Sequence, residues 1–346
     1  MYNDTENYAM TTSTTPLLLT YASDIRSVTH IFIAAVITFG GIISNMLAIT
    51  GIIRQKNWHG KVINPFYLNL AIADFIVCAV CLPITVVNHL LLNSWILNHS
   101  NCKILPTIQV FAITASSLTI IAINFERLYA AITPIRYSLQ VNSYKICFII
   151  AFIWIISSIF SLPNIFFLHT SIYSIDGRSF VLCSYVWKKL TSIGYIYIIF
   201  SALFYYIIPS VSAVISYRYI STKVSQNGRY LMKDQIELSG VYSLDGSTLS
   251  RCPTISRYTR IQRTATRLAI IVTTIHVLTW SGYPTLLLLQ LVKALPQKAN
   301  YLPDLSFSLK IIGFASSGFN PIIYVLNKSA KQPNSRPSRK SRIYSV

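Results

Sequence analysis

Seven long apolar segments dominate the sequence and leave few folds open to it. Each could cross the hydrocarbon core of a bilayer, about 30 Å thick, as a single α-helix. They cover residues 29–53, 65–92, 103–132, 145–168, 191–219, 264–292 and 304–326. Only 11% of the residues are charged, whereas a soluble domain would have about a quarter. The sequence therefore predicts an all-α membrane protein, a bundle of seven transmembrane helices.

The distribution of Lys and Arg predicts the orientation of this bundle. Basic residues gather in the connections after the first, third and fifth segments and in the tail, and are few elsewhere. Cytoplasmic loops retain Lys and Arg, so we expect the N-terminus outside and the C-terminus inside. The net charge of +19 then reflects topology, which predicts contact with membrane lipids and no binding of nucleic acid. The expected parts are an extracellular segment (1–28), a membrane domain (29–326) with a long cytoplasmic connection (220–262), and a cytoplasmic tail (327–346).

The expected outer side carries three local signals. Cys102 and Cys183 are the two cysteines that fall outside, and in an oxidising compartment they are expected to form a disulfide. Two β-prone runs flank Asp176 and Gly177, which favours a hairpin over an irregular loop. Two glycosylation sequons also lie on this side, at Asn3 and Asn98.

Polar and ionisable residues inside the apolar segments mark candidate sites, because lipid disfavours them. Asp74 lies near the middle of the second segment, and other segments carry uncharged polar groups at a similar depth: Asn45, Ser116, Ser316 and Asn320. This group could hold a small cation or a water cluster, or serve only to join helices, and spacing does not decide between these. Prolines predict kinks in five segments: Pro83, Pro163, Pro209, Pro284 and Pro321.

Landmark residues at characteristic spacing make the chain resemble the rhodopsin-like (class A) G-protein-coupled receptors over nearly its whole length. The landmarks are, in order, Asn45, Asp74, Trp95, Cys102, Arg127, Pro134, Trp154, Cys183, Pro209, Tyr217, Pro284 and the run "NPIIY" from Asn320 to Tyr324. The resemblance implies a multi-pass receptor of the plasma membrane, not an enzyme, that activates a heterotrimeric G protein.

The resemblance also implies roles for single residues. Glu126 would pair with Arg127 at rest, and activation would release Arg127 to meet the G protein and Tyr217. Tyr324, which follows Pro321 in the seventh segment, would stabilise the active state together with Tyr217. The group around Asp74 resembles the family's allosteric sodium pocket, and no other cofactor is implied.

Three departures from the family pattern concern the sixth segment. Where the family has a tryptophan two residues before the proline, this chain has Gly282, and Trp280 lies two residues earlier, about 200° around a helix. The signal would then have to reach Arg127 without the usual tryptophan. The family's central packing trio becomes Pro209, Ser117 and Leu278. Thr264 stands where some members have an acidic residue, which predicts raised basal activity.

The expected ligand follows from residues that differ from other branches of the family. Gln109 replaces the aspartate of amine receptors, and Phe314 replaces the lysine that binds retinal in opsins. Gln109 and the expected hairpin resemble neuropeptide receptors, so we expect a peptide ligand. The alternatives are a melatonin-like small molecule and, in a different class, an ion-coupled transporter.

Five residues are the expected ligand contacts: Gln109, Thr114, Tyr283, Lys310 and Phe314. Lys310 has three readings that the sequence leaves open. It could attract a ligand carboxylate, pair with Asp304, or extend its ammonium to the outer interface.

Overall fold

A computed structural model describes most of the apolar segments and their nearer connections. The described residues are 25–54, 63–90, 95, 97–133, 137, 142–175, 178–185, 196–197, 199–201, 203–220, 222, 253–292, 294 and 302–329. Asn3, most of the connection 220–262 and the tail from residue 330 lie outside them.

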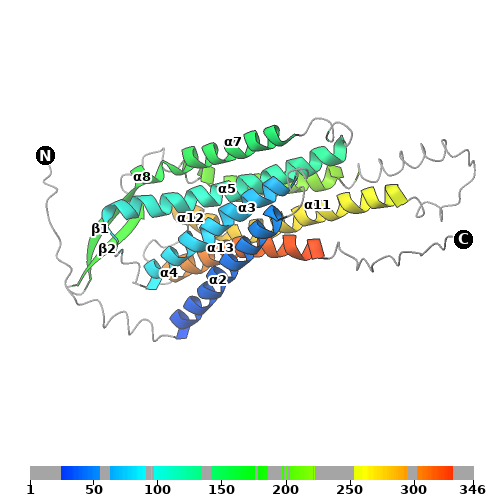
Figure 1. Cartoon of the computed structure of the whole chain (residues 1–346). Coiled ribbons are helices and arrows are strands. Elements are labelled where there is room, and N and C mark those ends of the chain that lie inside the picture. Colours follow the sequence, from blue (N-terminus) through cyan, green and yellow to red (C-terminus); the bar gives the residue numbers. More distant parts are fainter. Residues whose placement is uncertain are drawn as a thin grey trace, which may run out of the picture.

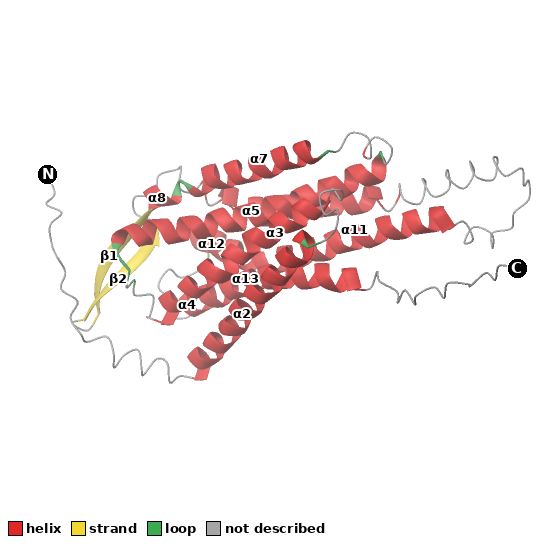
Figure 2. Ribbon diagram, viewed as in Figure 1, coloured by secondary structure: helices red, strands yellow, loops and turns green. Residues whose placement is uncertain are grey.

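Helices form a bundle of roughly parallel rods, with a two-stranded hairpin at one end (Figures 1 and 2). The elements are α2 (Ile25–Ile53), α3 (Ile63–Ile76), η2 (Val77–Cys81), α4 (Leu82–Leu90), α5 (His99–Ile132), α7 (Ser143–Ser161), α8 (Asn164–Phe167), β1 (Leu168–Ile175), β2 (Arg178–Tyr185), η4 (Leu203–Ile207), α11 (Pro253–Trp280), α12 (Gly282–Leu291) and α13 (Leu302–Ser329). The predicted helical membrane bundle is thus confirmed.

Within the described residues, six helical stretches are long and apolar enough to cross a membrane. They are Val28–Ile53, Pro65–His89, His99–Ile132, Tyr144–Phe167, Ile199–Ile220 and Thr266–Gln290. The seventh predicted segment forms α13, which carries Asp304, Lys310 and Lys328 and packs along α2 and α11. Every predicted segment therefore coincides with a helix of the bundle.

Proline interrupts the helices in three different ways. A π-helical turn, η2, comes just before Pro83, and η4 comes just before Pro209. Pro163 separates α7 from α8, and α11 breaks at Ser281, shortly before Pro284. A proline lacks the N–H that an α-helix needs, and at these four positions the preceding turn widens or ends. Around Pro321, in contrast, α13 is assigned as one continuous helix.

The hairpin predicted around residues 176–177 is present, although these two residues themselves lie outside the described part. β1 and β2 pair antiparallel, with Thr170 opposite Cys183. The expected disulfide joins Cys183 to Cys102 at the start of α5, with 5.6 Å between the Cα atoms. Trp95 and Leu168 pack around Cys102 and bury it. The disulfide thus fixes the hairpin over the end of the bundle.

Candidate functional site

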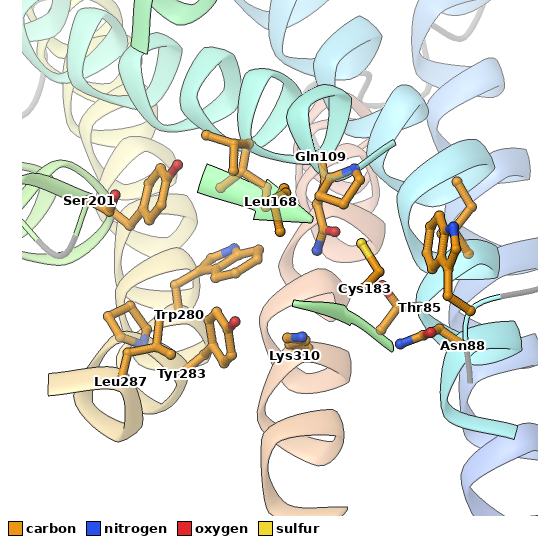
Figure 3. A pocket seen from close by; sticks show the side chains of 17 residues that line it. Thr85, Asn88, Gln109, Leu168, Cys183, Ser201, Trp280, Tyr283, Leu287 and Lys310 are labelled. Carbon is orange, nitrogen blue, oxygen red and sulfur yellow. The ribbon is translucent and has the colours of Figure 1, made fainter. Parts of the chain in front are cut away.

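A cavity of about 300 Å³ lies among the helices at the hairpin end of the bundle (Figure 3). Much of its wall is apolar, formed by Ile84, Val110, Ile113, Leu168, Trp280 and Leu287. Its polar side chains come from separate elements: Thr85 and Asn88 from α4, Gln109 from α5, Tyr283 from α12 and Lys310 from α13. Because a disulfide-fixed hairpin and several helices contribute to it, the cavity is shaped by the whole outer half of the fold.

Three of the five predicted ligand contacts line this cavity, and two lie beneath it. Gln109, Tyr283 and Lys310 face the cavity, as Figure 3 shows. Thr114 is fully buried, and its hydroxyl is 3.1 Å from that of Tyr205. Phe314 is also fully buried, with its ring edge-on to Trp280 at 5.5 Å between centroids. Thr114 and Phe314 therefore support the floor of the cavity rather than forming its surface.

The Lys310 ammonium has a defined position in the cavity. Its Nζ lies 5.0 Å from the ring centroid of Tyr283, within the range of a cation–π contact. Asp304, the acidic partner considered from the sequence, lies beside His89 instead, with Oδ1 3.8 Å from Nε2. The His89 ring stacks on Phe307 at 3.7 Å. Lys310 is therefore directed toward the cavity instead of toward the acid on its own helix.

The sixth segment differs from the expectation in which side chains face the inside of the bundle. α11 ends at Trp280, which is only 3% exposed and lines the floor of the cavity. Its indole fits against Gly313, where a Cβ would come within 3.0 Å of the ring. The expectation that the core lacks a tryptophan at this level was wrong, because α11 ends with Trp280 inside the bundle, four residues before Pro284.

The predicted packing trio changes for the same reason. Leu278 is 68% exposed on the outside of the bundle, so it does not join Ser117 and Pro209 in the core. His276 takes that place, with Nε2 3.0 Å from the Ser117 hydroxyl. Its Nδ1 is buried and, among the residues described, has no hydrogen-bond partner. A polar link therefore joins α5 to α11 one turn below Trp280.

A second polar group surrounds Asp74 in the middle of the bundle. Ser116 and the Asn320 amide donate hydrogen bonds to the two carboxylate oxygens, both at 2.8 Å, and the Ser317 hydroxyl also contacts Asp74. Asn45 donates to the carbonyl oxygens of Gly41 and Ser317 at 2.8 and 3.0 Å. These contacts link α2, α3 and α5 to α13 around one buried carboxylate.

Ser316 was predicted for this group, but its hydroxyl donates to Gly313 O of its own helix at 2.8 Å. Ser317, its neighbour, makes the contact with the carboxylate instead. The Oδ1 atoms of Asn45 and Asn320 are buried with no hydrogen-bond partner in the described structure. A carboxylate, hydroxyls and two spare amide oxygens are ligands that a hard monovalent or divalent cation accepts.

The opposite end of the bundle holds Glu126 and Arg127, near the end of α5. The guanidinium nitrogens Nε and Nη2 of Arg127 donate to the two Glu126 oxygens, and Arg127 is only 8% exposed. Tyr137 donates its hydroxyl to the same carboxylate. Burial, followed by the nearby Glu126 charge, raises the pKa of the Tyr137 phenol, which keeps it a donor at neutral pH. The arginine is thus held by a carboxylate that is itself held by a tyrosine.

Of the two tyrosines predicted to act with Arg127, Tyr217 is the one whose side chain is described. Tyr217 belongs to the fifth span and is 54% exposed in this conformation. Tyr324 lies on α13, but its side chain is outside the described set. Asn320 and Pro321 border the small cavity beside Asp74 rather than the arginine.

Comparison with known proteins decides the family. Residues 44–324 match the family "7 transmembrane receptor (rhodopsin family)". The chain is a rhodopsin-family receptor. It is therefore a multi-pass protein of the plasma membrane, in a family of signalling receptors and not of enzymes.

Similar proteins include several receptors named for peptides. The receptor is 25% identical to a QRFP-like peptide receptor of Branchiostoma floridae over 89% of this chain and 76% of that one. It is 24% identical to the thyrotropin-releasing hormone receptor of Mus musculus, over 86% and 76% of the two chains. It is also 28% identical to the human neuropeptide Y receptor type 4-2, over 60% and 54%.

Sequence reasoning missed several residues at the receptor's polar contacts. Tyr137 lies in a short connection, eleven positions after the glutamate that it contacts, and carries no local signal. His276 is an ionisable residue within a span, and its spacing of four from Trp280 would have placed both on one face. Asn69, which accepts from the Trp154 indole at 2.8 Å and donates to Thr119 at 2.7 Å, was not considered.

Proposed function

We propose that this receptor binds an extracellular peptide in the cavity beneath the hairpin and activates a heterotrimeric G protein at the Arg127 end. The observation that carries the proposal is the cavity, fixed by the Cys102–Cys183 bridge, in a chain whose relatives are named as peptide receptors. At about 300 Å³ it is at the lower end of the range for ligand sites, which suits the end of a peptide.

Three groups of side-chain contacts lie between this cavity and Arg127. Trp280 forms part of the floor and packs against Phe314 and Tyr205. One turn below, the His276–Ser117 contact joins α11 to α5. Farther along α5, Asn124 donates to Ser212 and Thr273, both at 3.1 Å, which links three spans. A ligand that displaces Trp280 would disturb these contacts in turn, and the last element is the Glu126–Arg127 pair.

The group around Asp74 is proposed as a site for an allosteric sodium ion. Asp74, Ser116 and Ser317 would supply a carboxylate and hydroxyl oxygens, and the spare Oδ1 atoms of Asn45 and Asn320 would complete the set. Such an ion would stabilise the arrangement in which Asn320 contacts Asp74, and so oppose activation. Asp74→Asn should remove any effect of sodium on agonist affinity, as measured against potassium at equal ionic strength.

The decisive experiment measures nucleotide exchange on purified G proteins by the receptor in lipid, with a library of short synthetic peptides. We expect some peptides to stimulate exchange, and Arg127→Ala to abolish the stimulation. Arg54→Ala is the matched control, because Arg54 is an exposed arginine just after α2, outside the Glu126 contact. Solute uptake by the receptor in proteoliposomes, with no exchange on any G protein, would refute the proposal in favour of a transporter.

A further inference from the structure

We propose that the cavity recognises a carboxylate next to an amide N–H, as found in an N-acylated amino acid or at the free C-terminus of a peptide. This inference rests on the proposed function in taking the cavity beneath the hairpin as the ligand site. It goes further by assigning the charge and the hydrogen-bonding pattern of the ligand group.

The first observation is the charge of the cavity. Of the described side chains that line it, Lys310 is the one that is charged at neutral pH, and none is a carboxylate. Burial of an ammonium beside apolar walls is costly unless an acceptor neutralises it. The Tyr283 ring lies 5.0 Å from Nζ and stabilises the charge, but it satisfies none of the three N–H donors as a full acceptor would.

The second observation is the position of Asp304, the acid on α13. Asp304 lies near the outer end of α13, and its carboxylate faces the buried imidazole of His89 at 3.8 Å. Salt bridges in the described residues do not include Lys310. The cavity therefore presents a cation whose counter-charge would come from a bound molecule.

The third observation is an acceptor in the same cavity. The Oδ1 of Asn88 is buried and has no hydrogen-bond partner within the described ranges. Figure 3 shows Asn88 and Lys310 reaching the cavity from different helices, with Gln109 directed toward it from α5. A ligand that places a carboxylate at Lys310 would satisfy the ammonium. Rotation of the Asn88 amide would bring its unpartnered oxygen to the cavity to accept an N–H of the same ligand, and Gln109 can donate to the carboxylate or accept from a second N–H.

The remaining wall defines the side chain that the ligand group would carry. Ile113, Leu168, Trp280 and Leu287 form an apolar surface beside the polar residues. An apolar or aromatic side chain on the terminal residue would pack there. A C-terminal amide, in contrast, carries no charge and would leave the ammonium uncompensated, so the cavity should prefer acid over amide.

The test uses two probes that differ only in this group, N-acetyl-L-phenylalanine and N-acetyl-L-phenylalaninamide. Thermal stabilisation of the purified receptor is measured as each is titrated to its solubility limit. We expect the acid to bind about tenfold tighter or more, because a charge-assisted hydrogen bond replaces a neutral contact. Lys310→Met should abolish the preference, while Lys310→Arg should retain it. Lys103→Met is the control for loss of an outer positive charge, since Lys103 does not line the cavity.

Equal binding of acid and amide, a preference that persists in Lys310→Met, or no binding of either probe would overturn the inference. The same comparison is then made with a peptide library synthesised with free and with amidated C-termini, read as G-protein nucleotide exchange. Active free-acid peptides would identify a peptide C-terminus as the source of the carboxylate, and activity of the N-acyl amino acid alone would identify a small molecule. Acid-selective binding without any exchange would refute the proposed function and leave the assignment of the cavity standing.

Discussion

Gly313→Ala tests whether Trp280 occupies the centre of the receptor as described. A Cβ added at Gly313 would lie 3.0 Å from Cδ2 and Cε3 of the indole, closer than ordinary contact. The indole has little room to move, because it is 3% exposed and is packed against Tyr205 and Phe314. Overpacking of a filled core costs about 1–3 kcal/mol. We therefore expect the variant to lose this much of its free energy of unfolding, less any gain in helix propensity.

Gly40→Ala provides the reference for that gain. Both glycines lie inside long helices, where alanine is favoured by up to about 1 kcal/mol, but a Cβ at Gly40 would meet nothing within 4 Å. The propensity gain cancels when the two variants are compared. The difference between their free energies of unfolding then measures the overpacking alone, and Gly313→Ala should be the less stable by about 1–3 kcal/mol.

Unfolding of the purified receptor in detergent, followed by tryptophan fluorescence or by a thiol-reactive dye, supplies the measurement. Trp280→Phe completes a double-mutant cycle, because its smaller ring leaves space for the new methyl group. The coupling between the two substitutions should be at least about 0.5 kcal/mol, with the pair more stable than the sum predicts. Equal stability of the two alanine variants, or strict additivity with Trp280→Phe, would show that the indole does not pack on Gly313.

Three further predictions follow from other contacts. Tyr137→Phe removes the hydrogen bond to Glu126, so Arg127 should be held less firmly and basal nucleotide exchange should rise; exchange at the wild-type level would contradict this. Ser117→Ala leaves the buried His276 ring without its described partner and should cost about 1–3 kcal/mol of stability, whereas Ser117→Ala with His276→Phe should recover most of it in the same unfolding assay. Asn98→Asp keeps the side-chain oxygen that caps the Asn101 N–H at 2.9 Å but removes the glycosylation site, and Ser100→Ala removes the sequon alone. Both variants should migrate faster than the wild type on gels before endoglycosidase treatment and together with it afterwards; equal migration before treatment would show that Asn98 carries no glycan.

The features that could be predicted from the sequence are those that local patterns determine. The length of the apolar segments predicted the helices, because a segment of that length crosses the hydrocarbon core as an α-helix. The turn residues between two β-prone runs predicted the hairpin. Cys102 and Cys183 could be paired because they were the two cysteines on the oxidising side. Gln109, Tyr283 and Lys310, which were expected as ligand contacts from the family resemblance, all line the cavity.

Errors arose in the facing of the sixth segment and in the depth of two other residues. The sixth segment was counted from Pro284, but in α11 Trp280 and His276 face inward and Leu278 faces outward. Thr114 and Phe314 were assigned to the correct faces but at the wrong depth, because Tyr205 and Trp280 fill the space above them. The depth of such residues depends on which side chains of neighbouring helices occupy the adjacent space. The sequence of a single segment does not contain that information.

The π-helical turn η2 lets the second span contain one residue more than a regular α-helix while both of its halves keep their facing. In a regular α-helix, an inserted residue would rotate everything beyond it by about 100°. The wider turn takes up the extra residue instead, so Asp74 stays directed toward its polar neighbours while Thr85 and Asn88 stay directed toward the cavity. The span therefore tolerates a difference of one residue in length at this turn, and related receptors can vary there without rebuilding either end of the bundle.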